Sequence, residues 1–289
     1  MAVSDLISTV IMGFAVAAVY FLLSMSLSLC FGVMRIVSLD QFVYYSVGAY
    51  MTYLVTAHQA SFWSGLLVGV AVSCTLAWAI EETLFRRLYE KGTMFSMITS
   101  YGILLAGIGV IKYIWGLVPR PVMAPITGQV ALLGTTLSLY RFVVIGLSAL
   151  IYVGLQLFLE KTIVGKAIRA GIEDADKTEG LGIDIYKIFT VTFLISAALS
   201  ALAGGLHAPL IMVEPEMGLK IMGTAFMIVI IGGLGSIKGT AVSSLLIGQV
   251  VAFGFLLWAP GAETAPFVIM LLVFLVRPRG LFGSAYLKR

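Results

Sequence analysis

The chain has 289 residues, of which 60% are hydrophobic and only 11% are charged. A soluble domain carries about 25% charged residues, so a water-facing surface of normal size could not be built from this composition. The net charge of +4 comes from 18 basic and 14 acidic residues. In a membrane protein such an excess marks cytoplasmic loops and gives no reason to expect nucleic acid binding. We therefore expect a polytopic bacterial inner-membrane protein.

The residue types that usually carry catalysis or metal binding are sparse. Cys30 and Cys74 fall in apolar runs without a CxxC spacing, which predicts neither a disulfide nor a metal site. His58 and His207 are isolated, whereas a metal site needs three or four converging ligands. GxSxG and HExxH motifs are absent from the sequence, so we expect no enzyme activity.

Apolar stretches along the chain predict its transmembrane helices. The first follows an N-terminus without the basic region of a cleaved signal peptide, so we expect it to be retained. Because a span takes about 20 apolar residues and several stretches are shorter, we predict about nine spans (8–10), some of them short or re-entrant. The candidates are 7–32, 40–57, 63–80, 94–115, 141–159, 188–208, 221–236, 240–258 and 265–277. The expected fold is an all-α membrane bundle in a single domain, 1–289.

Basic residues next to the spans predict the orientation. They gather in three segments, with Arg86, Arg87 and Lys91 in the first, Lys161, Lys166, Arg169, Lys177 and Lys187 in the second, and Arg277, Arg279, Lys288 and Arg289 in the tail. With nine spans all three segments fall on one side, which the positive-inside rule assigns to the cytoplasm. The N-terminus is then outside, the C-terminus cytoplasmic, and the proline-containing segment 116–140 an extended external loop.

The segment 160–187 holds eleven of the 32 charged residues (18 basic and 14 acidic), which excludes it from the lipid core. Its helical spacing predicts an apolar stripe of Ile163, Val164, Ala167, Ile168, Ile172 and Ala175, opposite Lys166, Arg169 and Glu173. Six acidic and five basic residues argue against simple adhesion to anionic lipid. A helix that inserts its apolar face into a partner's groove is favoured over a solvated connector.

A glycine-rich segment at 231–241 resembles a phosphate-binding loop only superficially. The order GxxxxGK[ST] is absent because Lys238 precedes Gly239, so we expect no nucleotide binding by this chain. Gly232, Gly233, Gly235 and Gly239 instead predict a tight cytoplasmic turn between closely packed helices, with Lys238 at the interface.

Charged residues near apolar stretches are candidates for function because their insertion into lipid is costly. Arg35 and Asp40 lie near the inner ends of the first two spans, where they could pair with each other. Lys112 can reach the outer interface, and Glu214 and Glu216 fit an external loop. The sequence contains no series of acidic residues along the spans, which a proton relay would need.

Several segments together resemble permeases of branched-chain amino-acid ABC importers. They are GVMRIVSLDQFVYYSVGAY (32–50), TIVGKAIRAGIEDADKTEGLGI (162–183), FLISAALSALAGGLHAP (193–209), MGLKIMGTAFMIVIIGGLGSIKGTAVSSLLIG (217–248) and RPRGLFG (277–283). The resemblance runs in order over most of the chain, and its last two blocks are the most specific.

The resemblance implies a transmembrane permease subunit for import. Its implied partners are a second homologous permease, as a heterodimer or alternatively a homodimer, an external solute-binding protein, and two cytosolic ATPases that use ATP and Mg. This chain would bind no cofactor itself. Segment 160–187 would couple the permease to the ATPases through Gly165, Lys166, Ile168, Arg169, Ala170, Ile172, Glu173, Asp174, Gly180 and Gly182.

One departure bears on the substrate. Where family members commonly carry an Asn-Phe-Ala-His-Gly-like stretch, this chain has Ser38-Leu39-Asp40-Gln41-Phe42. The implied substrates are branched-chain amino acids or a related small amide or carboxylate. Candidate residues of the substrate path are Asp40, Gln41, Tyr44, Tyr45, Thr99, Ser100 and Tyr101. A stand-alone secondary transporter or channel is the main alternative, followed by a membrane enzyme or assembly scaffold.

Overall fold

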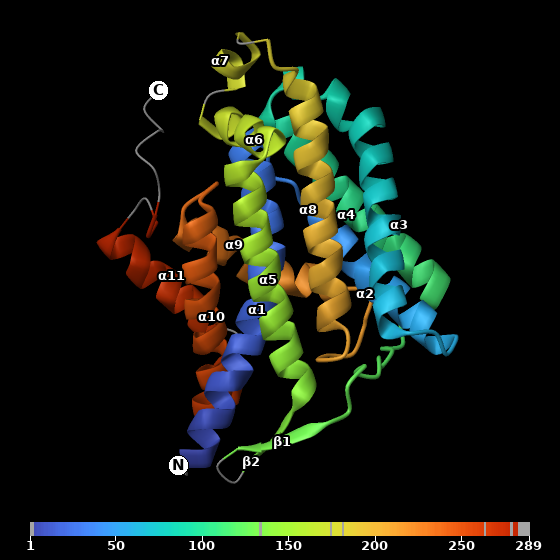
Figure 1. Cartoon of the computed structure of the whole chain (residues 1–289), viewed down its shortest axis with the longest axis vertical. Coiled ribbons are helices and arrows are strands. Elements are labelled where there is room, and N and C mark those ends of the chain that lie inside the picture. Colours follow the sequence, from blue (N-terminus) through green and yellow to red (C-terminus); the bar gives the residue numbers. More distant parts are fainter. Residues whose placement is uncertain are drawn as a thin grey trace.

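A computed structural model describes residues 3–132, 135–173, 175–180, 182–262, 264–277 and 280–282. It is a helical bundle with a small two-stranded sheet at one end (Figure 1). The helices are α1 (Val3–Met34), α2 (Gln41–Ala57), α3 (Phe62–Thr83), α4 (Thr93–Trp115), α5 (Leu139–Lys161), α6 (Ile163–Glu173), α7 (Ala175–Gly180), α8 (Ile185–His207), α9 (Met217–Gly232), α10 (Ile237–Trp258) and α11 (Ala265–Val276). Short 3-10 turns are η1 (Phe85–Arg87), η2 (Tyr89–Lys91) and η3 (Ala259–Gly261).

Each of the nine apolar stretches lies on a helix, but the helices differ in length. Within the described residues, six helices are long and apolar enough to cross a membrane, namely α1, α3, α4, α5, α8 and α10. Helices α9 and α11 are apolar but shorter, and α2 has 17 residues. The expected helical, multi-pass membrane class is confirmed.

Helix α2 forms the centre of the bundle. Every residue from Gln41 to Tyr50 is buried, and α2 packs against α3, α8 and α9. The backbones of α2 and α8 approach closely, since a Cβ added at Gly48 would lie 2.6 Å from the Ala201 Cα. Small residues permit such contacts between membrane helices, where hydrophobic burial gives little driving force. The position of an interior helix of this kind is expected to be set by the helices packed around it rather than by contact with lipid.

The two ends of the bundle differ in character. Helices α6 and α7 lie across one end, and the start of α1 lies at the other (Figure 1). The η2 turn lies at the same end as α6, because the ring centroids of Tyr89 in η2 and Phe189 in α8 are 5.1 Å apart. Residues 280–282 join them there, with the Leu281 N–H donating to the Ile231 carbonyl at 2.7 Å. The described basic residues of the three segments therefore lie at one end, with Arg277 representing the tail; Arg279, Lys288 and Arg289 are outside the described residues.

The opposite end carries an antiparallel hairpin, β1 (Gln129–Leu132) and β2 (Thr135–Ser138). Arg120 also forms an isolated bridge with Val213, which ties this segment to the loop after α8. The loop expected at 116–140 thus contains a hairpin, and the all-α expectation is corrected to this extent. Strands of four residues give too short a pattern to separate from loop by hydropathy alone.

Candidate functional site

The predicted docking helix α6 is joined to α5 by a sharp corner. The Thr162 hydroxyl donates to the Phe158 carbonyl at 2.7 Å and accepts from the Gly165 N–H at 2.9 Å. This residue therefore caps the end of α5 and the start of α6. A Cβ at Gly165 would overlap the Phe158 carbonyl oxygen and lie 2.5 Å from the Leu159 Cα. Only glycine fits this corner without a shift of one helix.

The apolar stripe predicted for α6 has a buried part and an exposed part. Ile168 is 1% exposed and faces the chain's own bundle, and Ile172 is half-buried. Ile163 and Val164 are 87% and 41% exposed. The expectation that the whole stripe inserts into a partner is therefore wrong, because Ile168 is buried in the chain's own core, where α6 packs against α1, α5 and α8. A face already buried within the chain is not available to another subunit.

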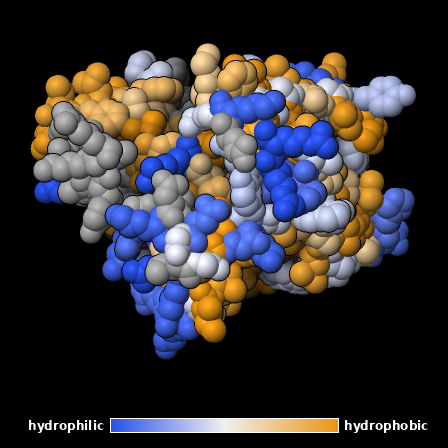
Figure 2. Space-filling view, turned by 90° about the horizontal axis from the view of Figure 1, so that it is seen from above, coloured by the Kyte–Doolittle hydropathy of each residue, from blue (hydrophilic) through white to orange (hydrophobic). Residues whose placement is uncertain are grey.

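The outer face of α6 is charged. Lys166, Arg169 and Glu173 are exposed, and Ala170 is half-buried. Seen from above, hydrophilic residues gather over this end of the molecule and apolar residues surround them (Figure 2). Gly180 and Gly182 lie in open space. Asp174 lies outside the described residues.

Several predicted path residues meet inside the bundle, at the start of α2. The Ser38 hydroxyl donates to Asp40 Oδ1 at 2.5 Å, and both Asp40 and Gln41 are fully buried. Gln41 accepts from the Ser200 hydroxyl at 3.2 Å and donates to the Cys30 sulfur at 3.6 Å. We name this group, which joins α1, α2 and α8, the central polar cluster; it comprises Ser26, Cys30, Ser38, Asp40, Gln41, Tyr44, Ser196 and Ser200.

The central polar cluster is not fully satisfied within the described part of the chain. Asp40 Oδ2, the Tyr44 hydroxyl and the Ser196 hydroxyl are buried and make no hydrogen bond of normal geometry there, although Tyr44 faces the Asp40 carboxyl and Ser196 faces the Cys30 thiol. Arg35 is exposed at the end of α1, with φ 52, and forms no ion pair with Asp40. The expected Arg35–Asp40 pair is thus wrong. Buried polar atoms are normally hydrogen-bonded, so each of these three needs an explanation.

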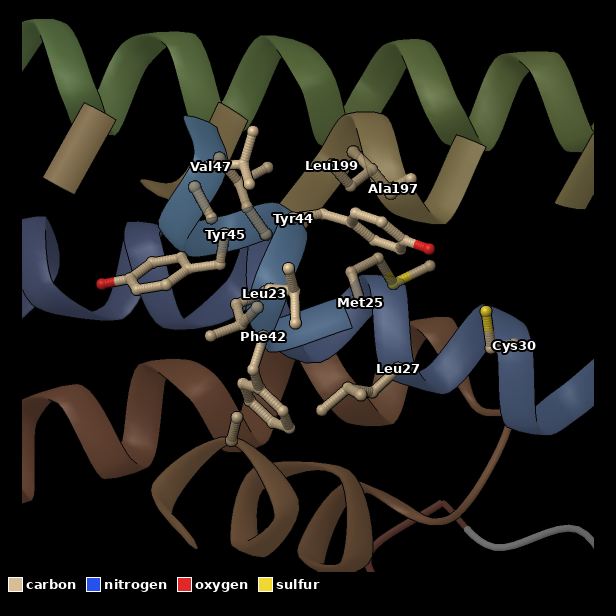
Figure 3. Close-up of a cluster of buried hydrophobic side chains, with 14 of the residues drawn as sticks. Leu23, Met25, Leu27, Cys30, Phe42, Tyr44, Tyr45, Val47, Ala197 and Leu199 are labelled. Atoms are coloured by element: carbon tan, nitrogen blue, oxygen red, sulfur yellow. The ribbon is translucent and has the colours of Figure 1, made fainter. Parts of the chain in front are cut away.

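The remaining predicted path residues lie outside this cluster. Tyr45 points away from Tyr44 on α2 (Figure 3), and its hydroxyl is 2.5 Å from His207 Nδ1. Ser100 of α4 donates to the Val37 carbonyl at 3.1 Å, which places it beside the segment before α2. Thr99 is half-buried. Tyr101 is 44% exposed, so it lies on the outer surface of α4.

A second buried carboxylate, Glu81, was missed from the sequence. It is fully buried near the end of α3 and accepts hydrogen bonds from Tyr89 and Thr190, both at 3.0 Å. Its neighbour Glu82 pairs with Arg86 at the surface, a pattern typical of a solvated helix end. The neighbouring charges Glu82 and Arg86 therefore made Glu81 look like part of a solvated helix end. The sequence signal that could have identified Glu81 is the helical face on which it lies. Glu81 fixes η2 to α8 at the α6 end.

The glycine-rich segment forms the predicted turn. Gly233 and Gly235 have φ values of 96° and 79°, which favour glycine. Helices α9 and α10 cross closely, because a Cβ at Gly232 would lie 2.5 Å from the Gly239 carbonyl carbon. Lys238 is exposed rather than packed between these helices. The tight turn between packed helices is confirmed.

An ion pair connects helices at the opposite end. Lys112 Nζ at the end of α4 lies 2.5 Å from Glu216 Oε1, just before α9. The hydrogen bond from Lys112 lowers the pKa of the Glu216 carboxyl below its ordinary value. Both side chains are partly exposed, at 36% and 47%, so the pair is screened by solvent.

Comparison with known proteins places the chain in a family. The family described as "Branched-chain amino acid transport system / permease component" matches residues 9–277. The chain is 25% identical to the high-affinity branched-chain amino acid transport system permease protein BraD of Pseudomonas aeruginosa, over 96% of this chain and 95% of that one. It is 22% identical to the permease protein LivH of Escherichia coli K12, over the same shares.

Two further similarities are more limited. A probable branched-chain amino acid transport permease protein LivH of Methanocaldococcus jannaschii is 30% identical over 150 residues, 48% of this chain and 47% of that one. The solved structure "PsaBC from Streptococcus pneumoniae in complex with Fab" has 14% identity and covers 95% of this chain and 92% of that chain, at a TM-score of 0.49. The match to nearly the whole chain decides the assignment: this protein belongs to the family of branched-chain amino acid transport permease components and is a transporter subunit, not an enzyme.

Proposed function

We propose that this chain is a translocation subunit of an ATP-binding-cassette importer in the bacterial inner membrane. Its substrates are branched-chain amino acids or closely related small solutes delivered by an external binding protein. The family match over residues 9–277 carries this proposal. We further propose a single permease domain over 1–289 that crosses the membrane nine times, with the N-terminus outside and the α6 end in the cytoplasm.

The coupling surface is proposed to be the outer face of α6. Its exposed charges, Lys166, Arg169 and Glu173, lie on a helix that is anchored through Ile168 and tightly joined to α5 through Gly165. A helix attached in this way moves with the bundle, so force applied to its outer face reaches the transmembrane helices. Two separate ATPase subunits supply that force and use ATP and Mg, whereas this chain binds neither.

The substrate path is proposed to pass the start of α2. Asp40, Gln41 and Tyr44 belong to the central polar cluster, and Ser100 contacts the segment that leads into it. Polar groups in the interior of a membrane bundle are costly, which favours a functional role for them. A second copy or homologue of this permease would complete the path, as the paired arrangement requires.

Purification and reconstitution test the proposal. The tagged chain, expressed with its adjacent genes, is expected to co-purify with ATPase subunits, and proteoliposomes should import leucine only with ATP and binding protein. Arg169→Ala combined with Glu173→Ala should lower uptake per ATP hydrolysed while assembly persists. Arg87→Ala, an exposed base at the same end, is the matched control and should behave as wild type. Leucine flux without any ATPase subunit would refute the importer.

A further inference from the structure

The segment that follows α4 is fastened to the loop after α8, at the end of the bundle opposite α6 (Figure 1). The Arg120 N–H donates to the Val213 carbonyl at 2.8 Å, and the Val213 N–H donates to the Arg120 carbonyl at 2.9 Å. Val213 is fully buried, so this pair of hydrogen bonds fixes the backbone that carries the Arg120 side chain. Arg120 is therefore positioned by the fold before any ligand arrives.

The Arg120 side chain lacks an acceptor. Among the residues that the structure describes, its Nε is buried without a hydrogen-bond partner, and its guanidinium forms no ion pair. A guanidinium keeps its charge in proteins and offers five donors in a planar fork. A buried donor without an acceptor is costly, so this group needs an explanation.

The hydroxyl of Tyr50 is a second buried donor in the same region. Tyr50, in the outer half of α2, is fully buried, and its ring packs on Trp115 at the end of α4 with centroids 4.9 Å apart. Its hydroxyl has no hydrogen-bond partner in the described ranges. It lies within electrostatic range of Arg120 and Glu214. An acceptor from outside the chain would serve both donors.

The charges around this position leave one positive charge unbalanced. The segments 112–122 and 213–220 carry three basic residues, Lys112, Arg120 and Lys220, and two acidic ones, Glu214 and Glu216. Lys112 Nζ lies 2.5 Å from Glu216 Oε1, and Lys220 Nζ lies 2.6 Å from Glu214 Oε1. Both acidic residues are thus paired with lysines, and the remaining charge is that of Arg120.

A neighbouring tyrosine shows how a buried hydroxyl is satisfied when its role is structural. Tyr140, at the start of α5, is buried, and its hydroxyl donates to the Leu206 carbonyl near the end of α8 at 2.7 Å. That bond joins two helices of the chain. The Tyr50 hydroxyl makes no such bond between described residues, so packing within the chain does not account for it.

We propose that Arg120 and Tyr50 form a binding site for a carboxylate at the outer end of the bundle. The guanidinium supplies the opposite charge and donates to the carboxylate oxygens, and the Tyr50 hydroxyl donates to one of them. A water molecule would accept these bonds but leave the charge of Arg120 unbalanced. The carboxylate belongs either to a free solute or to an acidic side chain of a protein outside the membrane, and the chemistry of the site is the same for both.

The first experiment measures acetate binding to the assembled transporter in nanodiscs, from the rise in thermal midpoint with acetate concentration. Acetate should stabilise wild type relative to sodium chloride at equal ionic strength, and acetamide, which has the same shape without the charge, should not. Arg120→Gln and Tyr50→Phe should each raise the acetate Kd about ten- to a hundredfold, because a hydrogen bond to a charged group is lost. Arg120→Lys, which keeps the charge and loses the fork, should fall between.

Two matched variants separate binding from stability. Tyr50→Phe keeps the ring on Trp115, so its midpoint without acetate should equal that of wild type. Tyr140→Phe loses the bond to Leu206 and should show the reverse, a lower midpoint with an unchanged acetate Kd. Arg141→Gln, at the start of α5, makes the same charge change at the same end and should leave the acetate Kd unchanged. If Arg120→Gln does not assemble, Tyr50→Phe carries the test.

The second experiment identifies the source of the carboxylate, and it rests on the proposed importer function. It measures the affinity of the external binding protein for the transporter and the KM of ATP-driven leucine uptake. If the ligand is an acidic side chain, Arg120→Gln and Tyr50→Phe should both weaken that affinity, and acetate should compete with the binding protein on wild type. If the ligand is a free solute, the affinity should stay unchanged and KM should rise in both variants.

The outcomes keep the two proposals apart. Equal effects of acetate and acetamide on wild type, or an unchanged acetate Kd in both Arg120→Gln and Tyr50→Phe, would overturn the site. Acetate binding without a change in either binding-protein affinity or KM would overturn it as well, because the bound acetate would then be adventitious. Absence of ATP-driven uptake by wild type would refute the importer, while the acetate result would stand by itself.

Discussion

The corner between α5 and α6 allows a sharp test of how the coupling helix is held. In Gly165→Ala the new methyl group would overlap the Phe158 carbonyl and lie 2.5 Å from the Leu159 Cα. Carbon atoms in contact are about 3.5–4.0 Å apart, so α6 must move by about 1 Å. Overpacking of this kind costs ~1–3 kcal/mol. Alanine recovers up to about 1 kcal/mol through helix propensity, so a net loss of roughly 0–2 kcal/mol is expected.

Gly171→Ala is the matched control on the same helix. Its methyl group would meet Val33 and Ile185 side chains at 3.6 Å, an ordinary contact, while the gain in helix propensity is the same. Uptake per ATP hydrolysed, and hydrogen exchange of the α6 amides, should both change in Gly165→Ala. Neither should change in Gly171→Ala. Equal coupling in the two variants would refute the idea that the α5–α6 corner positions the coupling surface.

Three further changes test the fold. Ser236→Ala removes the hydroxyl that caps α10 and should lower the free energy of thermal unfolding by about 1 kcal/mol. Ser61→Ala, at a helix start without a side-chain cap bond, should lower it by less. Equal losses in the two variants would contradict the capping role of Ser236. Glu81→Ala removes the acceptor of two buried hydrogen bonds and should cost roughly 2–3 kcal/mol, and a neutral result would show that those bonds do not form. Lys112→Met removes the group that lowers the Glu216 pKa. A lowered carboxyl pKa stabilises the fold only above the unfolded pKa, so the difference in thermal stability between wild type and Lys112→Met should be present at neutral pH and disappear as the pH falls through the folded pKa. The same difference should shrink in high salt.

The helices could be predicted from the sequence because hydrophobic runs and the amphipathic period are local properties. The short helix α6 was predicted from the spacing of Ile168 and Ile172, and both residues lie on its inner side. The sequence could not predict what the inner side of α6 packs against, because the orientation of α6 depends on the close contact between Gly165 and α5. Periodicity identifies an apolar face but does not say whether it is covered by the same chain or by a partner.

The central polar cluster shows the limit of local reasoning more clearly. Asp40 was a candidate from its position between apolar runs, but its partner depends on the chain path after α1. Arg35 adopts φ 52, which is uncommon for a residue other than glycine, and remains exposed at that bend. Gln41 meets Ser200 across 159 positions of sequence. Contacts of that range are set by helix packing and leave no pattern in the neighbouring residues.

Helix α1 connects the proposed coupling surface to the proposed substrate path at the start of α2. At its end, Val33 lies near the α6 position Gly171, where an added Cβ would be 3.6 Å from it. Cys30, in the central polar cluster, is one helical turn away, a distance of about 5 Å along the axis. A stiff helix transmits a displacement over that length without loss, and α1 leads directly into the segment that carries Ser38. Movement of α6 would therefore change the central polar cluster before it affected the opposite end of the bundle, so a coupling variant such as Gly165→Ala should alter substrate affinity as well as turnover.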